Sequence, residues 1–178
     1  MQPIKLLEKT LGQNADSLHC LFSQQDFSSI FPDFTAENLR MLLSRAVRND
    51  ILERVCKGIY LYTKTDYDPT LILFKVASKL RADNLNYVSL ETVLSQSGRI
   101  SQQLLGWITV MTTGRSGTIS CGRFGTVELI HTSKNFDKIM PELRLDRQTG
   151  MLWASEKLAL HDMKDCKRQM DLVEQSEI

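Results

Sequence analysis

The chain has 178 residues, and its 22 lysine and arginine residues against 21 aspartate and glutamate residues leave a net charge of +1. Hydrophobic residues make up 42% and charged residues 24% of the sequence, which is close to the average of globular proteins. This composition excludes a wholly disordered chain and a protein that is basic throughout. No apolar run approaches the roughly 20 residues of a membrane helix, and the first residues lack the apolar core of a signal peptide. We therefore expect a cytoplasmic protein that does not bind membranes.

The four cysteines lie far apart in the sequence: Cys20, Cys56, Cys121 and Cys166. No Cys-x-x-Cys motif occurs, and no histidine stands at the spacing from a cysteine that structural zinc sites require. Scattered thiols of this kind are typical of a reducing compartment. We expect free thiols that are packed or half-buried, with no disulfide and no metal or other cofactor.

A polar segment, residues 63–69, divides the sequence into two parts. It follows a strand-like run and ends in Asp68-Pro69, a capping residue followed by proline, which is a typical helix start. The length of the chain suits one domain or two small ones. We place a boundary here and expect an N-terminal domain of residues 1–66 and a C-terminal domain of residues 67–178. The predicted fold class is α+β (mixed α/β).

Two helices are predicted at the start of the N-terminal domain. Apolar residues recur at helical spacing from Ile4 to Leu11, and Gly12 is expected to end that helix. Residues 23–26 have the S-x-x-D pattern of a capping box, in which the first and last residues satisfy each other's backbone N–H groups. The second helix should run to about residue 31, because Pro32 cannot continue its hydrogen bonds.

A third helix is predicted to start at Thr35, a good N-cap residue. Two short strands, residues 51–55 and 59–62, follow it and form a hairpin through a turn that contains Gly58. This order of a helix, a short helix, a turn, a longer helix and a hairpin is typical of a winged helix-turn-helix, which we predict here. The inward face of the third helix is expected to consist of Leu39, Leu42, Leu43 and Ala46.

The outward face of the third helix carries residue types that bind DNA. An α-helix fits the major groove, where arginine binds guanine, asparagine binds adenine, and serine or threonine contacts either base or phosphate. Residues 38–57 include five basic and two acidic residues, a local charge of +3 in a nearly neutral chain. The predicted DNA-binding residues on the helix and on the hairpin, which would form the wing, are Thr35, Asn38, Arg40, Ser44, Arg45, Arg48, Arg54 and Lys57.

Two other interpretations of this surface stay open. Arginine at helical spacing also occurs on ordinary solvated helix faces, and a winged helix can bind another protein in place of DNA. Glu37, near the start of the helix, would oppose phosphate, although it also favours the helix dipole.

Helices and a small sheet are predicted for the C-terminal domain. One helix is expected from Pro69 to about Arg81, and a second from Ser89 to about Gly98, with a short strand at residues 87–88 between them. Further strands are expected at residues 107–111, 118–121 and 126–131, and a turn-rich crossing at residues 137–150. Ser155 is expected to cap a final amphipathic helix. The apolar stripe of that helix comprises Ala159, Met163, Cys166, Met170 and Val173.

No catalytic motif stands out. Residues 114–117 lack the lysine of a phosphate-binding loop, there is no G-x-S-x-G nucleophile elbow, and the downstream aspartates do not form a D-x-D pair. We expect a non-enzyme without catalytic residues, because an enzyme would need clustered acidic, histidine or cysteine side chains. Structural roles are expected for all three histidines, which are His19, His131 and His161.

Several segments of the chain, in a specific order, carry a resemblance to a known family. In the N-terminal domain these are Asp26-Phe27, Phe31-Pro32 and residues 42–60, where a leucine-rich helix is followed by Ile-Leu, basic residues and Lys-Gly-Ile-Tyr. In the C-terminal domain they are residues 87–98, 108–115, 124–128 and 154–160. Together they resemble the AbiEi family of antitoxins from bacterial type IV (abortive-infection) toxin–antitoxin systems.

The resemblance implies two activities. The N-terminal domain would repress its own operon by binding inverted repeats in the promoter, and the C-terminal domain would counteract a co-encoded nucleotidyltransferase-like toxin without forming a stable complex. The alternative is a winged-helix transcriptional regulator without antitoxin activity, whose gene would have no nucleotidyltransferase-like neighbour. The resemblance also implies which residues face the DNA. On the recognition helix these are Arg40, Ser44, Arg45 and Arg48, and on the wing they are Arg54 and Lys57.

Overall fold

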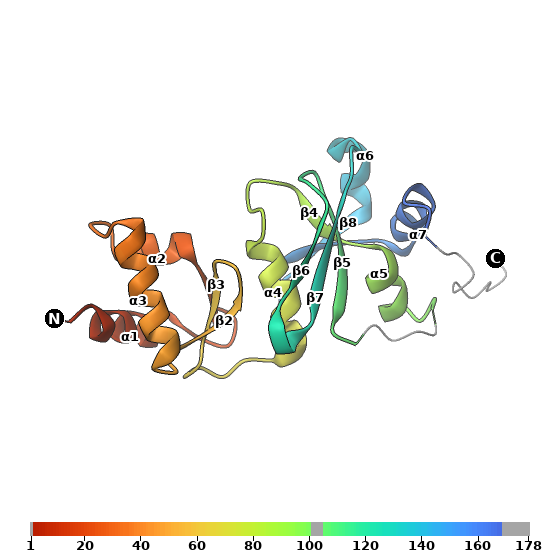
Figure 1. Cartoon of the computed structure of the whole chain (residues 1–178). Coiled ribbons are helices and arrows are strands. Elements are labelled where there is room, and N and C mark those ends of the chain that lie inside the picture. Colours follow the sequence, from red (N-terminus) through yellow and green to blue (C-terminus); the bar gives the residue numbers. More distant parts are fainter. Residues whose placement is uncertain (1, 101–104, 169–178) are drawn as a thin grey trace. The chain divides into compact units, whose positions relative to one another are not determined.

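The computed structural model describes residues 2–100 and 105–168. Its contacts divide the chain into two compact units, Met1–Thr70 and Leu71–Ile178. Both units mix helices and strands, and each has its own sheet (Figure 1). The protein is therefore α+β, as the sequence predicts at this level.

The first unit packs three helices against a small antiparallel sheet. Its elements in chain order are α1 (Pro3–Asn14), β1 (Leu21–Ser23), α2 (Gln24–Ile30), α3 (Ala36–Arg48), β2 (Leu52–Cys56) and β3 (Ile59–Tyr62). The strands are arranged in the order β1-β3-β2. The three helices and the hairpin match the prediction, whereas β1 was not predicted.

Gly12 does not end α1, contrary to the prediction. The helix continues to Asn14, whose side-chain amide donates a hydrogen bond of 2.7 Å to the Thr10 carbonyl oxygen. That bond ties the side chain of the last helical residue back to the preceding turn of α1. The glycine is accommodated inside the helix, where a Cβ atom would lie 3.6 Å from the Tyr62 hydroxyl group.

The capping box at the start of α2 is confirmed. The Ser23 hydroxyl accepts a hydrogen bond of 3.2 Å from the Asp26 N–H, and the Ser23 N–H donates one of 2.6 Å to the Asp26 carboxylate. The Phe22 and Phe27 rings lie 5.9 Å apart on either side of the cap. Because Ser23 is also the last residue of β1, one residue both ends a strand and starts a helix.

The core of the first unit forms where α3 meets the other elements. The predicted inward residues of α3 are buried, and they belong to one cluster with Leu7 and Leu11 of α1 and Phe27 of α2. Phe27 also contacts the Tyr60 ring edge-on, with the ring centres 5.8 Å apart, which joins α2 to the hairpin. The opposite face of α3 is thereby directed to solvent.

A single 3₁₀ turn (Pro69–Leu71) spans the boundary between the two units and leads into α4. The Asp68 carboxylate accepts a 2.8 Å hydrogen bond from the Thr70 N–H in this turn, but α4 itself begins at Ile72, three residues later than predicted. The elements that follow are α4 (Ile72–Lys79), β4 (Asn86–Val88), α5 (Leu90–Gln96), β5 (Trp107–Thr112), β6 (Gly117–Ser120), β7 (Thr126–His131), α6 (Phe136–Ile139), β8 (Leu143–Asp146), β9 (Met151–Ala154) and α7 (Glu156–Asp165).

One six-stranded sheet organises the second unit, with the order β6-β7-β5-β4-β9-β8. The pairs β5–β7 and β4–β9 are parallel, and the other pairs are antiparallel. Helix α4 contacts β5, β7 and β9, while α5 packs on α7 and β5. Figure 1 shows α4 on one face of this sheet and α5 and α7 on the other.

The expectation of a turn-rich crossing at residues 137–150 was wrong in part. Residues 143–146 form β8, which pairs with the equally unpredicted β9 at the edge of the sheet. The turn between these strands is held by Asp146, whose carboxylate accepts hydrogen bonds from the N–H (2.9 Å) and the hydroxyl (2.6 Å) of Thr149. Strand β8 has only four residues, Leu-Arg-Leu-Asp, and so short an alternation is easily missed in a polar segment of the sequence.

The final helix starts at Ser155 as predicted, with the Ser155 hydroxyl accepting a 3.1 Å hydrogen bond from the Leu158 N–H. Ala159 and Met163 are buried, whereas Cys166 follows the end of the helix and is half-buried. The last two members of the predicted apolar stripe, Met170 and Val173, lie outside the described residues.

A buried carboxylate anchors α7 to the sheet. Asp162 is 0% exposed; it accepts a 2.6 Å hydrogen bond from the Ser89 hydroxyl and forms an ion pair with Lys134. Lys134 also contacts the half-exposed Asp165 at 2.9 Å. Burial opposes the charge of Lys134, but the bonds to the two carboxylates outweigh it and raise its pKa. Burial, followed by the charge of Asp162, raises the pKa of the Tyr87 phenol.

Replacing Asp162 by alanine is expected to lower the free energy of unfolding of the second unit by about 3 kcal/mol, because removing one partner of a buried pair is strongly destabilising. The matched change Asp165→Ala removes an exposed partner of the same lysine and should cost less than about 1 kcal/mol. Both tryptophans, Trp107 and Trp153, belong to the second unit, so urea unfolding followed by tryptophan fluorescence measures this unit. Equal losses in the two variants would contradict the role given to Asp162.

Candidate nucleic-acid interface

The N-terminal end of α3 is fixed by its own cap. The Thr35 side-chain oxygen accepts a 3.2 Å hydrogen bond from the Asn38 N–H, which satisfies one of the N–H groups exposed at the start of the helix. The helix then runs for 13 residues to Arg48. Its amphipathic pattern is regular, so the polar residues project from the side opposite the core.

All of the predicted DNA-binding side chains are exposed. Six lie on α3 or at its cap, one lies on β2, and one lies in the hairpin turn. Within the first unit, β2 packs against α3, so the two groups belong to neighbouring elements. These exposed residues are Thr35, Asn38, Arg40, Ser44, Arg45, Arg48, Arg54 and Lys57.

The basic residues of this surface differ in their pairing. The Arg40 guanidinium lies 2.6 Å from the Glu37 carboxylate, one helical turn earlier, and both side chains are largely exposed. Exposed pairs of this kind are weak, so Arg40 can still exchange its partner for a phosphate. Within the part of the chain that the structure describes, Arg45 and Arg48 form no ion pair. They are the cations that α3 presents without compensation.

The hairpin turn is held close to the start of α2. Gly58, at a φ of +79°, completes the turn, and the ladder between the strands shifts register between Arg54 and Cys56. The Gly58 carbonyl oxygen accepts a 2.9 Å hydrogen bond from the Gln24 N–H. Lys57 therefore projects from a short turn of fixed position, and not from a long loop.

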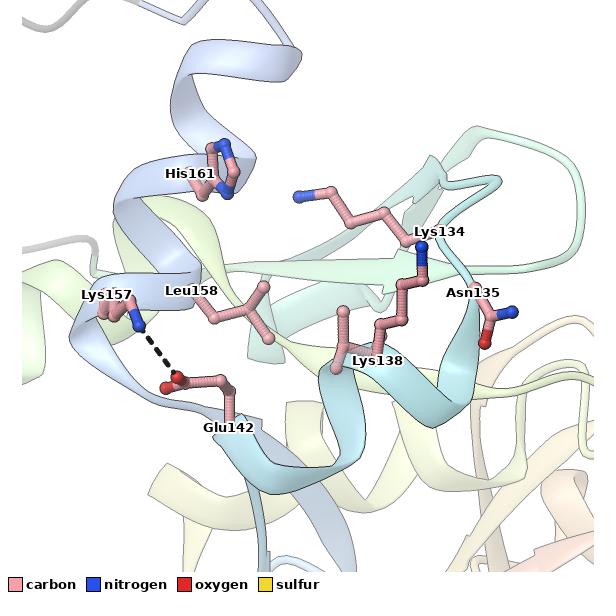
Figure 2. A pocket seen from close by; sticks show the side chains of 8 residues that line it. Lys134, Asn135, Lys138, Glu142, Lys157, Leu158 and His161 are labelled. Carbon is pink, nitrogen blue, oxygen red and sulfur yellow. Dashed lines mark hydrogen bonds and ion pairs between the residues drawn. The ribbon is translucent and has the colours of Figure 1, made fainter.

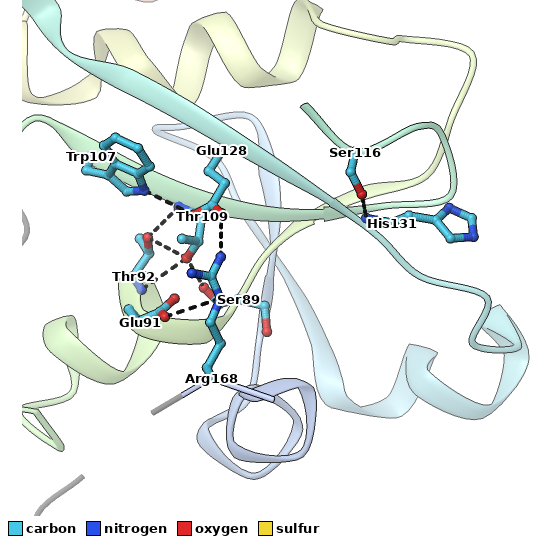
Figure 3. Close-up of polar contacts among 9 residues, drawn as sticks. All are labelled: Ser89, Glu91, Thr92, Trp107, Thr109, Ser116, Glu128, His131 and Arg168. Carbon is cyan, nitrogen blue, oxygen red and sulfur yellow. Dashed lines mark hydrogen bonds and ion pairs between the residues drawn. The ribbon is translucent and has the colours of Figure 1, made fainter. Parts of the chain in front are cut away.

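The second unit brings together two carboxylates that the sequence did not single out. Arg168 forms ion pairs with Glu128 and, at 3.6 Å, with Glu91, and the Trp107 indole N–H donates a 3.2 Å hydrogen bond to Glu128 (Figure 3). The three charged residues come from distant parts of the chain, so no local pattern could reveal them. The arginine occupies the space between the carboxylates, and the cluster ties residue 168 to α5 and β7.

The hydroxyl groups beside this cluster are also engaged with one another. The Thr109 hydroxyl donates a 2.7 Å hydrogen bond to the Ser89 carbonyl oxygen and lies 3.0 Å from the Thr92 hydroxyl (Figure 3). The Thr92 oxygen accepts a 2.7 Å bond from the Thr109 N–H. These buried bonds join the start of α5 to β5 and leave no activated nucleophile among them.

A pocket of about 460 Å³ lies between α6 and α7 in the second unit. Leu158 points into it and Asn135 points away, while Lys134 extends toward His161 (Figure 2). The volume falls in the range of small-molecule sites. Its charges decide what it can bind.

Two lysines of this pocket are engaged in ion pairs. Lys134 is held by Asp162 and Asp165, and the Lys157 ammonium lies 3.3 Å from the Glu142 carboxylate. Two of the three lysines that line the pocket, which are Lys134, Lys138 and Lys157, therefore have acidic partners, and the lining itself contains one carboxylate, Glu142.

The other two histidines make local contacts. The His19 ring lies 3.0 Å from the Asp16 carboxylate, and the His131 ring lies 2.8 Å from the Gly114 carbonyl oxygen. Both histidines are exposed. Among residues 2–100 and 105–168, no group of three or more histidine, cysteine or acidic side chains is arranged to hold a metal ion.

No protein-family model matches the sequence, and no curated protein matches it significantly. Within the described residues, no helix combines the length and the apolar character needed to cross a membrane. The function must therefore be argued from the geometry of the surface and from the resemblance stated above.

Replacing Thr35 by alanine is expected to lower the stability of the first unit by about 1 kcal/mol, because α3 loses its side-chain cap. The matched change Ser44→Ala removes a hydroxyl from an exposed position inside the same helix and should leave stability nearly unchanged. Thermal unfolding followed by far-ultraviolet circular dichroism measures both. A Thr35→Ala variant as stable as the wild type would show that the start of α3 is held by other contacts.

Proposed function

We propose that the protein is a double-stranded DNA-binding repressor of its own promoter and that it acts as an AbiEi-like antitoxin. The observation that carries the DNA-binding part is the exposed face of α3, where Arg45 and Arg48 have no acidic partner among the described residues. Free guanidinium groups on a rigid helix suit guanine edges and phosphates.

The topology of the first unit supports a winged helix-turn-helix. Its element order, with two helices before the hairpin and a strand before them, and its strand order β1-β3-β2 are both compatible with that fold. In such a domain α3 would be the recognition helix and the β2–β3 hairpin the wing. Arg54 and Lys57 would then meet the DNA backbone next to the groove that α3 enters.

Binding to inverted repeats would require two copies of the chain on one operator. Helix-turn-helix dimers bind half-sites about one helical turn of DNA apart, or multiples of it. Each copy would contribute the basic side chains of one α3. The small net charge of the whole chain does not oppose this, since phosphate contacts depend on local charge within about 10 Å.

The antitoxin part of the proposal rests on the resemblance of residues 87–98, 108–115, 124–128 and 154–160 to the AbiEi family. These segments form the centre of the second unit, including β4, β5 and α7. The expected counterpart is a co-encoded nucleotidyltransferase-like toxin, neutralised without a stable complex. A regulator without antitoxin activity is the alternative, and the same first unit would serve it.

The double variant Arg45→Ala/Arg48→Ala is expected to bind the upstream DNA of its own gene at least ten-fold more weakly than the wild type. Because two phosphate or base contacts are lost, the slope of log affinity against log salt should fall by about 2. Gel shifts at two or more salt concentrations, with scrambled DNA as competitor, measure both quantities.

A matched control is Lys5→Ala/Lys9→Ala, which removes the same charge from exposed positions of α1. This control should keep the affinity within about two-fold and leave the slope unchanged. Wild-type affinity in the arginine variant would show that α3 is not the DNA-binding surface. If the wild-type protein binds neither DNA, the surface would be assigned to a protein partner.

Co-expression with the nucleotidyltransferase-like gene beside its own is expected to restore growth that the toxin gene alone arrests. Arg45→Ala/Arg48→Ala should still restore growth, since neutralisation is assigned to the second unit, when both genes are expressed from promoters that the protein does not regulate. Colony counts measure the rescue. If the toxin still arrests growth when the wild-type chain is co-expressed, the antitoxin part of the proposal is wrong. The alternative, a regulator without antitoxin activity, would then be favoured.

A further inference from the structure

Met41 is the long apolar side chain that α3 leaves on its outer face. It is 58% exposed, whereas Leu39, Leu42 and Leu43 of the same helix are buried. Isolated exposed apolar residues are common, and exposure alone indicates nothing. The neighbours of Met41 are what distinguish it.

The position of Met41 is within the surface assigned to DNA. With about 3.6 residues per turn, Met41 lies one turn before Ser44 and Arg45 and two turns before Arg48, and all of these side chains are exposed. It is the sixth of the 13 residues of α3. It therefore belongs to the N-terminal half, which a recognition helix presents to base edges.

The chemistry of methionine suits one feature of the major groove. A thioether donates no hydrogen bond and accepts one only weakly, so it cannot read the polar edge of a base. The apolar group that DNA displays in this groove is the C5 methyl of thymine. Asn38, one turn before Met41 and also exposed, can bind the adenine that pairs with thymine. The polarisable, flexible thioether adapts its shape to such a contact.

We propose that Met41 contacts the methyl group of a thymine in each operator half-site and selects an A·T pair there. This inference rests on the proposed DNA-binding function and adds a base preference that the arginines do not supply, since arginine selects guanine. The contact would also bury the Met41 thioether, which is exposed in the free protein.

The test uses the full-length protein and its own upstream DNA, with the operator located by footprinting. Each thymine of the half-sites is replaced in turn by deoxyuridine, which pairs identically but lacks the methyl group. For the wild type, replacement of the thymine at one position in each half-site should weaken binding about four-fold per half-site. A four-fold loss of affinity corresponds to the burial of one methyl group. All other replacements should have little effect.

Met41→Ala should bind the thymine and deoxyuridine operators equally, and alanine preserves the helix because it has the highest helix propensity. The control Leu18→Ala truncates a side chain of similar exposure, 56%, outside α3, and should keep the four-fold difference. This inference alone is overturned if no deoxyuridine replacement weakens binding of the wild type. It is also overturned if removal of the methyl group weakens binding of Met41→Ala as much as that of the wild type. Failure of the wild type to bind any upstream DNA overturns the proposed function and this inference together.

Discussion

The burial of one face of α3 is the constraint on which the first unit depends. Leu39, Leu42 and Leu43 pack into one cluster with α1 and α2, and each buried leucine contributes about 2 kcal/mol. An exposed ion pair such as Arg40–Glu37 contributes far less. Because a helix is rigid, fixing its inner face also fixes the direction of its outer face. Arg45 and Arg48 are thereby displayed on the outer face, although neither forms an ion pair with any described residue.

The second unit is organised differently, around one buried and one partly buried polar network. Asp162 reaches the sheet side of α7 and meets Ser89 and Lys134 there, while Arg168 closes a second network with Glu91 and Glu128. Buried charges are costly unless they are paired and hydrogen-bonded. The buried Asp162 therefore fixes the position of α7. A shift of the helix by one residue would separate Asp162 from both Ser89 and Lys134 and leave its buried charge unpaired.

The helix caps and the buried helix face were predicted best, because each depends on residues a few positions apart in the sequence. The cap at Thr35, the capping box at residues 23–26 and the inward face of α3 each follow from spacings of a few positions, and the structure confirms all three. The exposed positions of the candidate site within α3 follow from the same helical period. Its identity as a DNA surface stays a prediction, because exposure and charge are shared by ordinary solvated helices.

Local sequence patterns could not predict the strands and ion pairs that depend on residues far apart in the chain. Strand β1 has only three residues, too few for an alternating pattern, and the four-residue β8 is defined by its pairing with β9. The pairs Lys134–Asp162 and Arg168–Glu128 join positions 28 and 40 residues apart. The packing of α7 and of the residues after it against α5 and the sheet brings these pairs together, and no spacing within the sequence encodes that packing.

The double role of Ser23 has a consequence for how the first unit opens. Its backbone belongs to the edge strand β1, and its hydroxyl closes the first turn of α2. Fluctuations that detach β1 from β3 would therefore also release the start of α2, and the Gln24–Gly58 bond would carry the same opening to the tip of the hairpin. These three segments would form one cooperative unit of local unfolding, so hydrogen exchange at their backbone amides would report one common free energy of opening.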